Sequence, residues 1–271
     1  MSHVILTLLT RPETAPATLA GAERLAALLG EARIEALVMR MPPMATILAT
    51  EEVLTKDQEK RIRDQETERA AALRGVFESW AAKRGGAKQP RWIDEEGVTE
   101  TLVKSWGQRA DYIVVGRPNA HAHPTEYDAL HAAVFVTERP VLIMPPSPAV
   151  EFGKTVAIAW RHDKFSLHAL LAALRCLSQA KQVHVLMGYR PGDAPPKIPD
   201  VLTEHDIDAT GHELLIGKEI FGAQLLATAH DLHADLLVMG AFVHSAWHHL
   251  LFGGVTKYVL EHADIPVLMR H

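Results

Sequence analysis

Cysteine is almost absent from this 271-residue sequence, in which Cys176 is the only one. A single thiol cannot form an internal disulfide bond, so the fold must depend on its apolar core. This cysteine usage is typical of proteins in a reducing compartment, and we expect a cytoplasmic protein. Cys176 falls on an apolar helix face with Leu170 and Leu174, which predicts an inert core thiol.

Long apolar runs and a targeting sequence are missing as well. No stretch approaches the roughly 18 consecutive apolar residues that a membrane-spanning helix requires. Residues 1–10 lack the charged region and the long apolar region of a secretory signal peptide. We therefore expect no membrane association.

The sequence has no surplus of positive charge and no familiar catalytic pattern. Its 28 Lys and Arg residues against 33 Asp and Glu residues give a net charge of −5, which argues against a nucleic-acid partner. No Ser-His-Asp order, nucleophile elbow, P-loop or HExxH zinc motif is present. The sequence gives no support for an enzyme, and no catalytic residue is assigned.

What the sequence does contain is an internal repeat. Three strand-like segments occur twice in the same order. The matching pairs are 4–9 with 155–160, 109–116 with 233–240, and 139–144 with 265–270. The repeat predicts two domains, residues 1–147 and residues 148–271, which meet at the proline-rich segment Pro145–Pro148.

Strand-like and helix-like segments alternate through both halves. Expected strands are 4–9, 34–39, 91–94, 111–115, 140–144, 155–160, 183–187, 213–215, 236–239 and 265–269. Expected helices are 19–29, 51–83, 98–106, 125–135, 166–177, 200–205, 219–232 and 255–262. With right-handed crossovers, this alternation predicts an α/β fold with two tandem Rossmann-like open parallel sheets, each in the strand order 3-2-1-4-5.

Glycines mark the loop between the last two strands. Gly240 ends a short apolar run, and Gly253 and Gly254 precede a helix that begins near Val255. Glycine lets the backbone approach a ligand closely, and the free N–H groups at the start of a helix bind anions. The loop therefore has the arrangement of an anion-binding site.

The spacing of these residues carries a family resemblance. Gly240, Val243 and the pair Gly253-Gly254 resemble the G-x2-G-x9-G-[ST] signature of the universal stress protein (UspA-like) family. The flanking segments, ADLLVMG before the loop and HADIPVL after it, resemble the family too. The resemblance is strong from residue 155 to residue 271 and weaker from residue 1 to residue 146.

The resemblance implies a tandem universal stress protein with two adenine nucleotide alpha hydrolase-like halves. The terminal strands 141–144 and 267–269 would pair with each other, which makes the two halves an intramolecular pseudo-dimer. A further homodimer and an unknown protein partner remain open. In members that bind ATP, an Asp ends the first strand and the signature loop holds the phosphates.

The candidate site departs from that pattern. Val243 stands in place of the second glycine, Gly254 in place of Ser or Thr, and Arg161 in place of the Asp. Thr256 lies near enough in sequence to supply the missing hydroxyl. The candidate cofactor-binding residues are Trp160, Arg161, Gly240, Val243, Gly253, Gly254, Val255 and Thr256.

Two of these residues have alternative roles. Arg161 contacts a phosphate or fills the site itself. Trp160 packs at the top of the second sheet or stacks on adenine. In the first half, Arg117 and Pro118 follow Gly116 and no glycine pair precedes the helix, which indicates a lost site.

Three functions compete on this evidence. The leading one is a non-enzymatic binding or regulatory module of the stress response. The first alternative is ATP binding through the C-terminal loop, with or without slow hydrolysis; we predict weak or absent ATP binding, confined to that half, and assign no cofactor with certainty. The second alternative is a ligand-free scaffold that binds a partner through the long polar helix of the first half.

Histidine is frequent, with 16 residues, but no metal site is predicted. The histidines nearest the two loops are His121, His123, His131, His244, His248 and His249. A zinc site needs three or four converging ligands, and no Cys lies near these residues. We interpret them as exposed loop residues.

Overall fold

A computed structural model of the chain describes residues 2–46, 54–84, 89–118, 124–146, 151–217, 220–241 and 254–271. The first half contains β1 (His3–Leu8), α1 (Ala15–Leu29), β2 (Ala32–Arg40), α2 (Lys56–Ala81), β3 (Arg91–Glu96), α3 (Thr99–Gly107), β4 (Tyr112–Gly116), α4 (Pro124–His131) and β5 (Val141–Met144). The second half contains β6 (Thr155–Trp160), α5 (Lys164–Leu177), β7 (Gln182–Tyr189), α6 (Asp200–Glu204), β8 (Thr210–Leu215), α7 (Phe221–Asp231), β9 (Leu236–Gly240), α8 (Gly254–His262) and β10 (Val267–Arg270).

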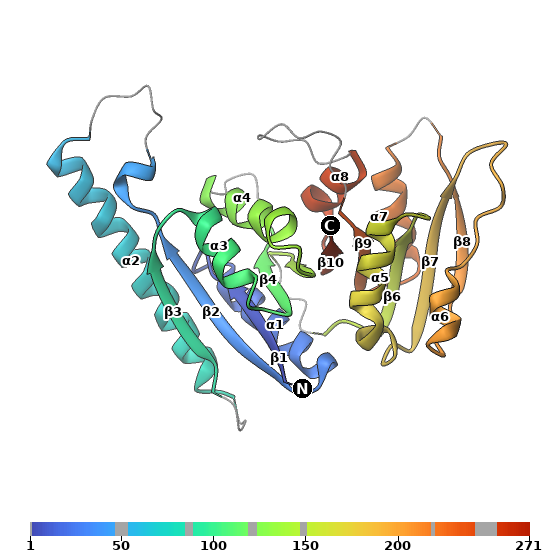
Figure 1. Cartoon of the computed structure of the whole chain (residues 1–271), viewed down its shortest axis with the longest axis horizontal. Coiled ribbons are helices and arrows are strands. Elements are labelled where there is room, and N and C mark those ends of the chain that lie inside the picture. The colour runs from blue at the N-terminus through green and yellow to red at the C-terminus, as the bar shows by residue number, and fades with distance from the viewer. Residues whose placement is uncertain are drawn as a thin grey trace.

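The described strands form one ten-stranded sheet in the order β3-β2-β1-β4-β5-β10-β9-β6-β7-β8 (Figure 1). Read from its outer edge to the centre, each half has the order 3-2-1-4-5, which confirms the predicted topology. Neighbouring strands within each half are parallel. The two sheets are therefore two copies of one pattern, joined edge to edge.

The join is the antiparallel pair β5–β10, as predicted for the two terminal strands. Val267 lies opposite Ile143, Leu268 opposite Leu142, and Met269 opposite Val141. All six of these side chains are buried. Pairing removes the free edge that each sheet would otherwise expose to other chains.

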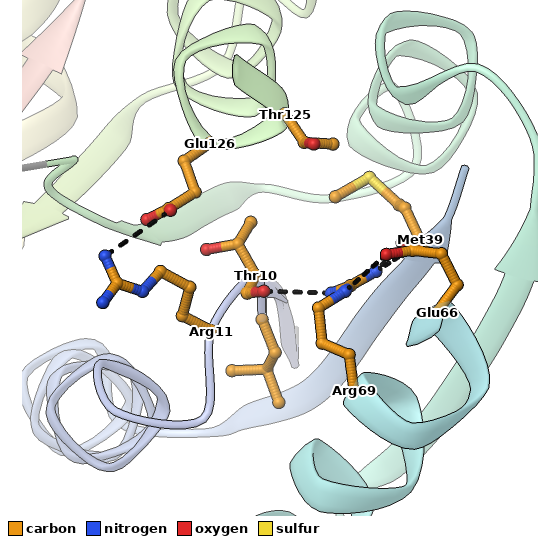
Figure 2. A pocket seen from close by; sticks show the side chains of 8 residues that line it. Thr10, Arg11, Met39, Glu66, Arg69, Thr125 and Glu126 are labelled. Carbon is orange, nitrogen blue, oxygen red and sulfur yellow. Dashed lines mark hydrogen bonds and ion pairs between the residues drawn. The ribbon is translucent and has the colours of Figure 1, made fainter. Parts of the chain in front are cut away.

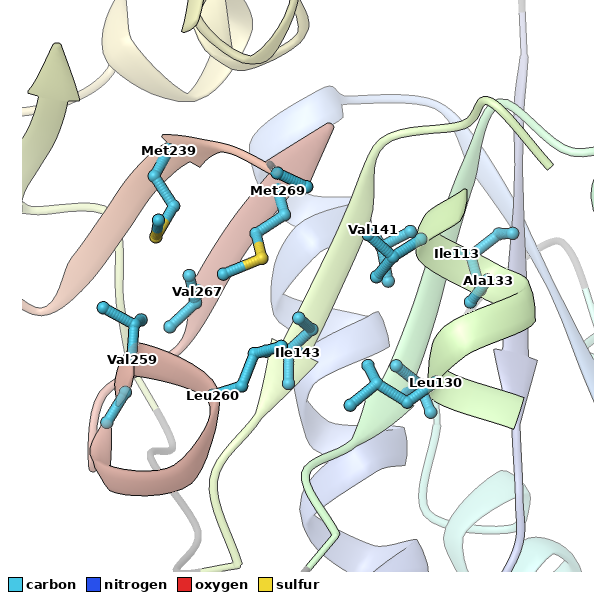
Figure 3. Close-up of a cluster of buried hydrophobic side chains, with 14 of the residues drawn as sticks. Ile113, Leu130, Ala133, Val141, Ile143, Met239, Val259, Leu260, Val267 and Met269 are labelled. Carbon is cyan, nitrogen blue, oxygen red and sulfur yellow. The ribbon is translucent and has the colours of Figure 1, made fainter. Parts of the chain in front are cut away.

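Helices cover both faces of this central seam. On one face, α4 contributes Leu130 and α8 contributes Val259 and Leu260 to the cluster around the seam (Figure 3). On the other face, α1 and α5 pack over β5 and β10. A hydrogen bond also joins β4 of the first half to α5 of the second: the Tyr112 hydroxyl donates to the Ala172 carbonyl at 2.7 Å. The hydrophobic core thus runs without interruption from one half into the other.

Several helix boundaries differ from the prediction. Helix α1 begins at Ala15, not at Leu19, because Pro16 occupies its first turn, where a missing N–H costs nothing. Helix α2 begins at Lys56, where Thr55 and Gln58 form a capping box; the predicted start at Glu51 lies outside the described residues. Helix α4 ends at His131 and continues as a π-helix, Ala132–Val136.

Two further predictions concern the linker and membranes. Residues 147–150, at the predicted domain boundary, lie outside the described residues, so the boundary remains a prediction. Across the described part of the chain, no helix combines the length and the apolarity that crossing a bilayer requires.

Candidate functional site

A cavity of about 440 Å³ lies where the strand order of the second half reverses, at the carboxyl ends of β6 and β9. In an open α/β sheet this is the position where ligands bind. The predicted residues that line it are Trp160, Arg161, Gly240, Gly254, Val255 and Thr256. Val243 and Gly253 lie outside the described residues. The structure thus brings six of the eight candidate residues to one cavity.

The wall of the cavity is largely apolar. Leu186 of β7 and Phe221 and Leu225 of α7 contribute to it, with Ile216 and Ile220 from the segment between β8 and α7. The side chain of Ile220 is 61% exposed, which is unusual for isoleucine and places an apolar surface at the rim. These residues were not predicted. The rule that ligands bind at the carboxyl ends of the strands applies to β7 as it does to β6 and could have indicated Leu186.

Two arginines line the same cavity. Arg161 follows β6, and Arg190 follows β7; Arg190 was not predicted. No Asp or Glu is among the described lining residues. The charge of the described lining is therefore positive, which favours an anionic ligand.

Asp163 explains how Arg161 is held. One carboxylate oxygen of Asp163 accepts hydrogen bonds from the backbone N–H groups of Phe165 and Ser166, each at 3.0 Å, and so caps α5. The other oxygen pairs with Nε of Arg161. This carboxylate is committed to a helix start and to an arginine, and it is not among the residues that line the cavity.

The glycines of the candidate site differ in what they require. A Cβ at Gly240 would lie 2.8 Å from the backbone carbonyl carbon of Phe165 and 2.8 Å from the backbone nitrogen of Ser166. Only glycine therefore fits at the end of β9. A Cβ at Gly254 would have no heavy atom within 4 Å, so the start of α8 borders open space.

In the first half, an ion pair from α2 lies at the ends of β1 and β2, which correspond to β6 and β7 (Figure 2). Arg69 donates to the Thr10 carbonyl at 2.9 Å and to the Met39 carbonyl at 2.6 Å, and it pairs with Glu66 at 2.7 Å. A cavity of about 340 Å³ remains beside them. In this half, the ends of β1 and β2 are therefore contacted by Arg69, a side chain of the protein's own helix α2. Arg69 and Glu66 were predicted only as part of a solvated polar helix.

The first half also reaches the helix that borders the second cavity. Arg117, the residue after β4, donates to the backbone carbonyls of Leu260 and Glu261 in the last turn of α8. Burial lowers the pKa of Arg117 from its ordinary value. A cation at the C-terminus of a helix satisfies its free carbonyls and stabilises its dipole. The start of α8 lines the cavity while its end is held by the other half.

Most of the histidines considered for a metal lie outside the described residues. The exception is His131 at the end of α4, whose ring lies 5.2 Å from that of Phe135. Within the described ranges, no group of three or more His, Cys, Asp or Glu side chains is placed to hold a metal ion.

Cys176 lies fully buried on α5. Burial raises the pKa of its thiol to about 12. A thiol that stays protonated at neutral pH is unreactive. The predicted core position of this cysteine is confirmed, and its low reactivity stays a prediction.

Comparison with known proteins supports the resemblance. Residues 215–271 match the Universal stress protein family. The chain is similar in structure to the universal stress protein from Archaeoglobus fulgidus DSM 4304, with a TM-score of 0.69 and 14% sequence identity over 99% of this chain and 98% of that one. It is also similar to a functionally unknown protein from Pseudomonas aeruginosa PAO1, with a TM-score of 0.58 and 14% identity over 98% and 92% of the two chains. A search of curated proteins gives no match. The chain therefore carries a universal stress protein segment at residues 215–271, within a fold that it shares over its whole length with such a protein.

Proposed function

We propose that this chain is a non-enzymatic tandem universal stress protein that binds a nucleotide-sized anion in its C-terminal half and acts in the cytoplasm. The observation that carries the proposal is the cavity at the ends of β6 and β9, with its apolar wall, its positive charge and the glycine at the end of β9. In the first half, Arg69 contacts the ends of β1 and β2, the counterparts of β6 and β7, which supports a structural role for that half.

The side chains around the cavity favour binding over catalysis. A general base must lie within hydrogen-bond reach of the proton that it removes. The described lining residues include the hydroxyls of Ser166 and Thr256 but no His, Cys, Asp, Glu, Lys or Tyr. The described lining thus supplies contacts for binding, and we propose that the bound ligand leaves the site chemically unchanged.

ATP fits this site only in part. The volume, the apolar wall and the close approach that Gly240 permits suit an adenine nucleotide. A carboxylate that could accept hydrogen bonds from ribose hydroxyls is missing among the described lining residues, and Arg161 follows β6 in its place. We therefore propose that Mg-ATP binds weakly, with a dissociation constant nearer millimolar than micromolar.

The test combines mass spectrometry of the denatured protein with titration calorimetry. We expect a co-purified small anion, or weak heat with Mg-ATP, and loss of either in Ala159→Leu, because Ala159 lines the cavity and the added carbons fill it. The matched control is Ala72→Leu on the exposed face of α2. Binding that survives Ala159→Leu in a folded protein would place the ligand elsewhere. Turnover of ATP by the purified protein would refute the non-enzymatic assignment.

A further inference from the structure

The cavity of the second half offers an anion two separate sets of contacts. One set is at the start of α8, where Gly254, Val255 and Thr256 line the cavity and the helix presents its positive end. The other set is at the ends of β6 and β7, where Arg161 and Arg190 line it. The apolar wall described above joins the two. A ligand that uses the whole cavity therefore has an apolar body and two anionic groups.

The second set of contacts is the unusual one. A carboxylate beside the ribose recognises its hydroxyls, whereas a guanidinium accommodates a phosphate on the sugar. Arginine binds phosphate through paired N–H groups in a fixed fork, which makes the contact selective for a planar or tetrahedral oxyanion. Asp163 pairs with Nε of Arg161, which favours one orientation of a side chain that is 65% exposed.

We propose that the C-terminal pocket selects a nucleotide that is phosphorylated on its ribose ring as well as at the 5′ position. The base lies against the wall formed by Leu186, Phe221 and Leu225, and the 5′-phosphate lies at the start of α8. The ribose phosphate meets Arg161 and Arg190. This inference rests on the proposed function, since it names the ligand class of the same pocket.

Two isomeric ligands test the proposal with the full-length protein. Adenosine 3′,5′-bisphosphate and adenosine 5′-diphosphate share the base, the sugar and the number of phosphates, and they differ in where the second phosphate sits. In calorimetry at fixed ionic strength without magnesium, we expect the 3′,5′-bisphosphate to bind at least ten times more tightly than the 5′-diphosphate. Adenosine 2′,5′-bisphosphate reports which ribose oxygen carries the selected phosphate.

Variants assign the selectivity to the two arginines. Arg161→Gln and Arg190→Gln should each weaken the 3′,5′-bisphosphate at least tenfold and change the 5′-diphosphate less than threefold. Both side chains are exposed, so the variants should keep the wild-type melting temperature. Arg161→Asp should reverse the preference. Arg74→Gln, on the exposed surface of α2, removes an arginine far from the pocket and should change neither affinity.

The outcomes separate the two proposals. Equal affinities, or a preference for the 5′-diphosphate, would overturn the ribose-phosphate inference and leave the proposed binding function intact. A preference that persists unchanged in both arginine variants would also overturn it, because the selected phosphate would then lie elsewhere. No binding of any nucleotide would remove the nucleotide as ligand class and the inference with it.

Discussion

We expect the packing at the seam between β5 and β10 to stabilise both halves against unfolding. The substitution Ile143→Ala tests this prediction. Ile143 is 1% exposed and lies opposite Val267 across the seam. The substitution removes three carbons, worth about 2.4 kcal/mol at about 0.8 kcal/mol per buried carbon. The cavity left behind adds to this, since measured values for Ile→Ala are about 2–5 kcal/mol. We expect a loss of about 3 kcal/mol in the free energy of unfolding.

Urea unfolding, followed by far-ultraviolet circular dichroism and by tryptophan fluorescence, measures the loss. With a slope of about 3 kcal/mol per molar urea, the midpoint should fall by about 1 M. Three of the five tryptophans lie in residues 1–147 and two in residues 148–271, so single-tryptophan versions report on each half separately. We expect both reports to shift together, because the side chain belongs to a cluster that both halves build.

The matched control is Leu171→Ala on α5, where the leucine is 43% exposed. It should cost less than about 1 kcal/mol. The reasoning is refuted if Ile143→Ala costs no more than the control. It is also refuted if the first half alone loses stability while the midpoint of the second half is unchanged, since the seam would then not couple them.

Two other predictions concern titration and the glycines. Burial raises the pKa of Tyr112 from 10.0 to about 12, so the folded state keeps a proton that the unfolded state releases; its contribution of about 2 to 3 kcal/mol is complete below pH 10 and is lost as the pH rises from 10 to 12. Urea midpoints at pH 9, 10 and 11 check this, and Tyr112→Phe should flatten the slope; an equal slope in that variant contradicts the assignment. Gly240→Ala forces a Cβ against backbone atoms and should lower the melting temperature by several degrees, whereas Gly254→Ala meets no atom and should not; equal melting temperatures would show that the end of β9 yields.

The fold could be predicted because the same local signal occurs ten times. Most strands are short apolar runs, and within each half a helix separates each strand from the next. The repeat then fixed the topology, since two matching halves of five strands have matching orders. Boundaries were less predictable: Pro16 reads as a break in sequence but serves as a first-turn residue, and β8 begins at Thr210, three residues before the predicted start.

The parts of the candidate site that depend on spacing along the chain could be predicted, whereas those that depend on packing between distant segments could not. Gly240 and the start of α8 come from a spacing along the chain, and Arg161 comes from the end of a strand. Arg69 lies at the end of the polar stretch of α2, residues 56–69, and only the placement of that helix against β1 and β2 brings Arg69 to their ends. A contact between distant segments leaves no periodic signal in the sequence.

Arg117 marks a difference between the two halves at equivalent positions of the repeated fold. It follows β4, as Ala241 follows β9. The backbone N–H of each donates to the last strand of its own half, Arg117 to Met144 at 2.7 Å and Ala241 to Arg270 at 2.9 Å. At this equivalent position the first half has the long side chain of Arg117, whose guanidinium contacts the end of α8. The first half thus uses the exit of its fourth strand to hold a helix of its neighbour. At the same position the second half has the short side chain of Ala241. The cavity beside it is lined by Gly240 and by the start of α8.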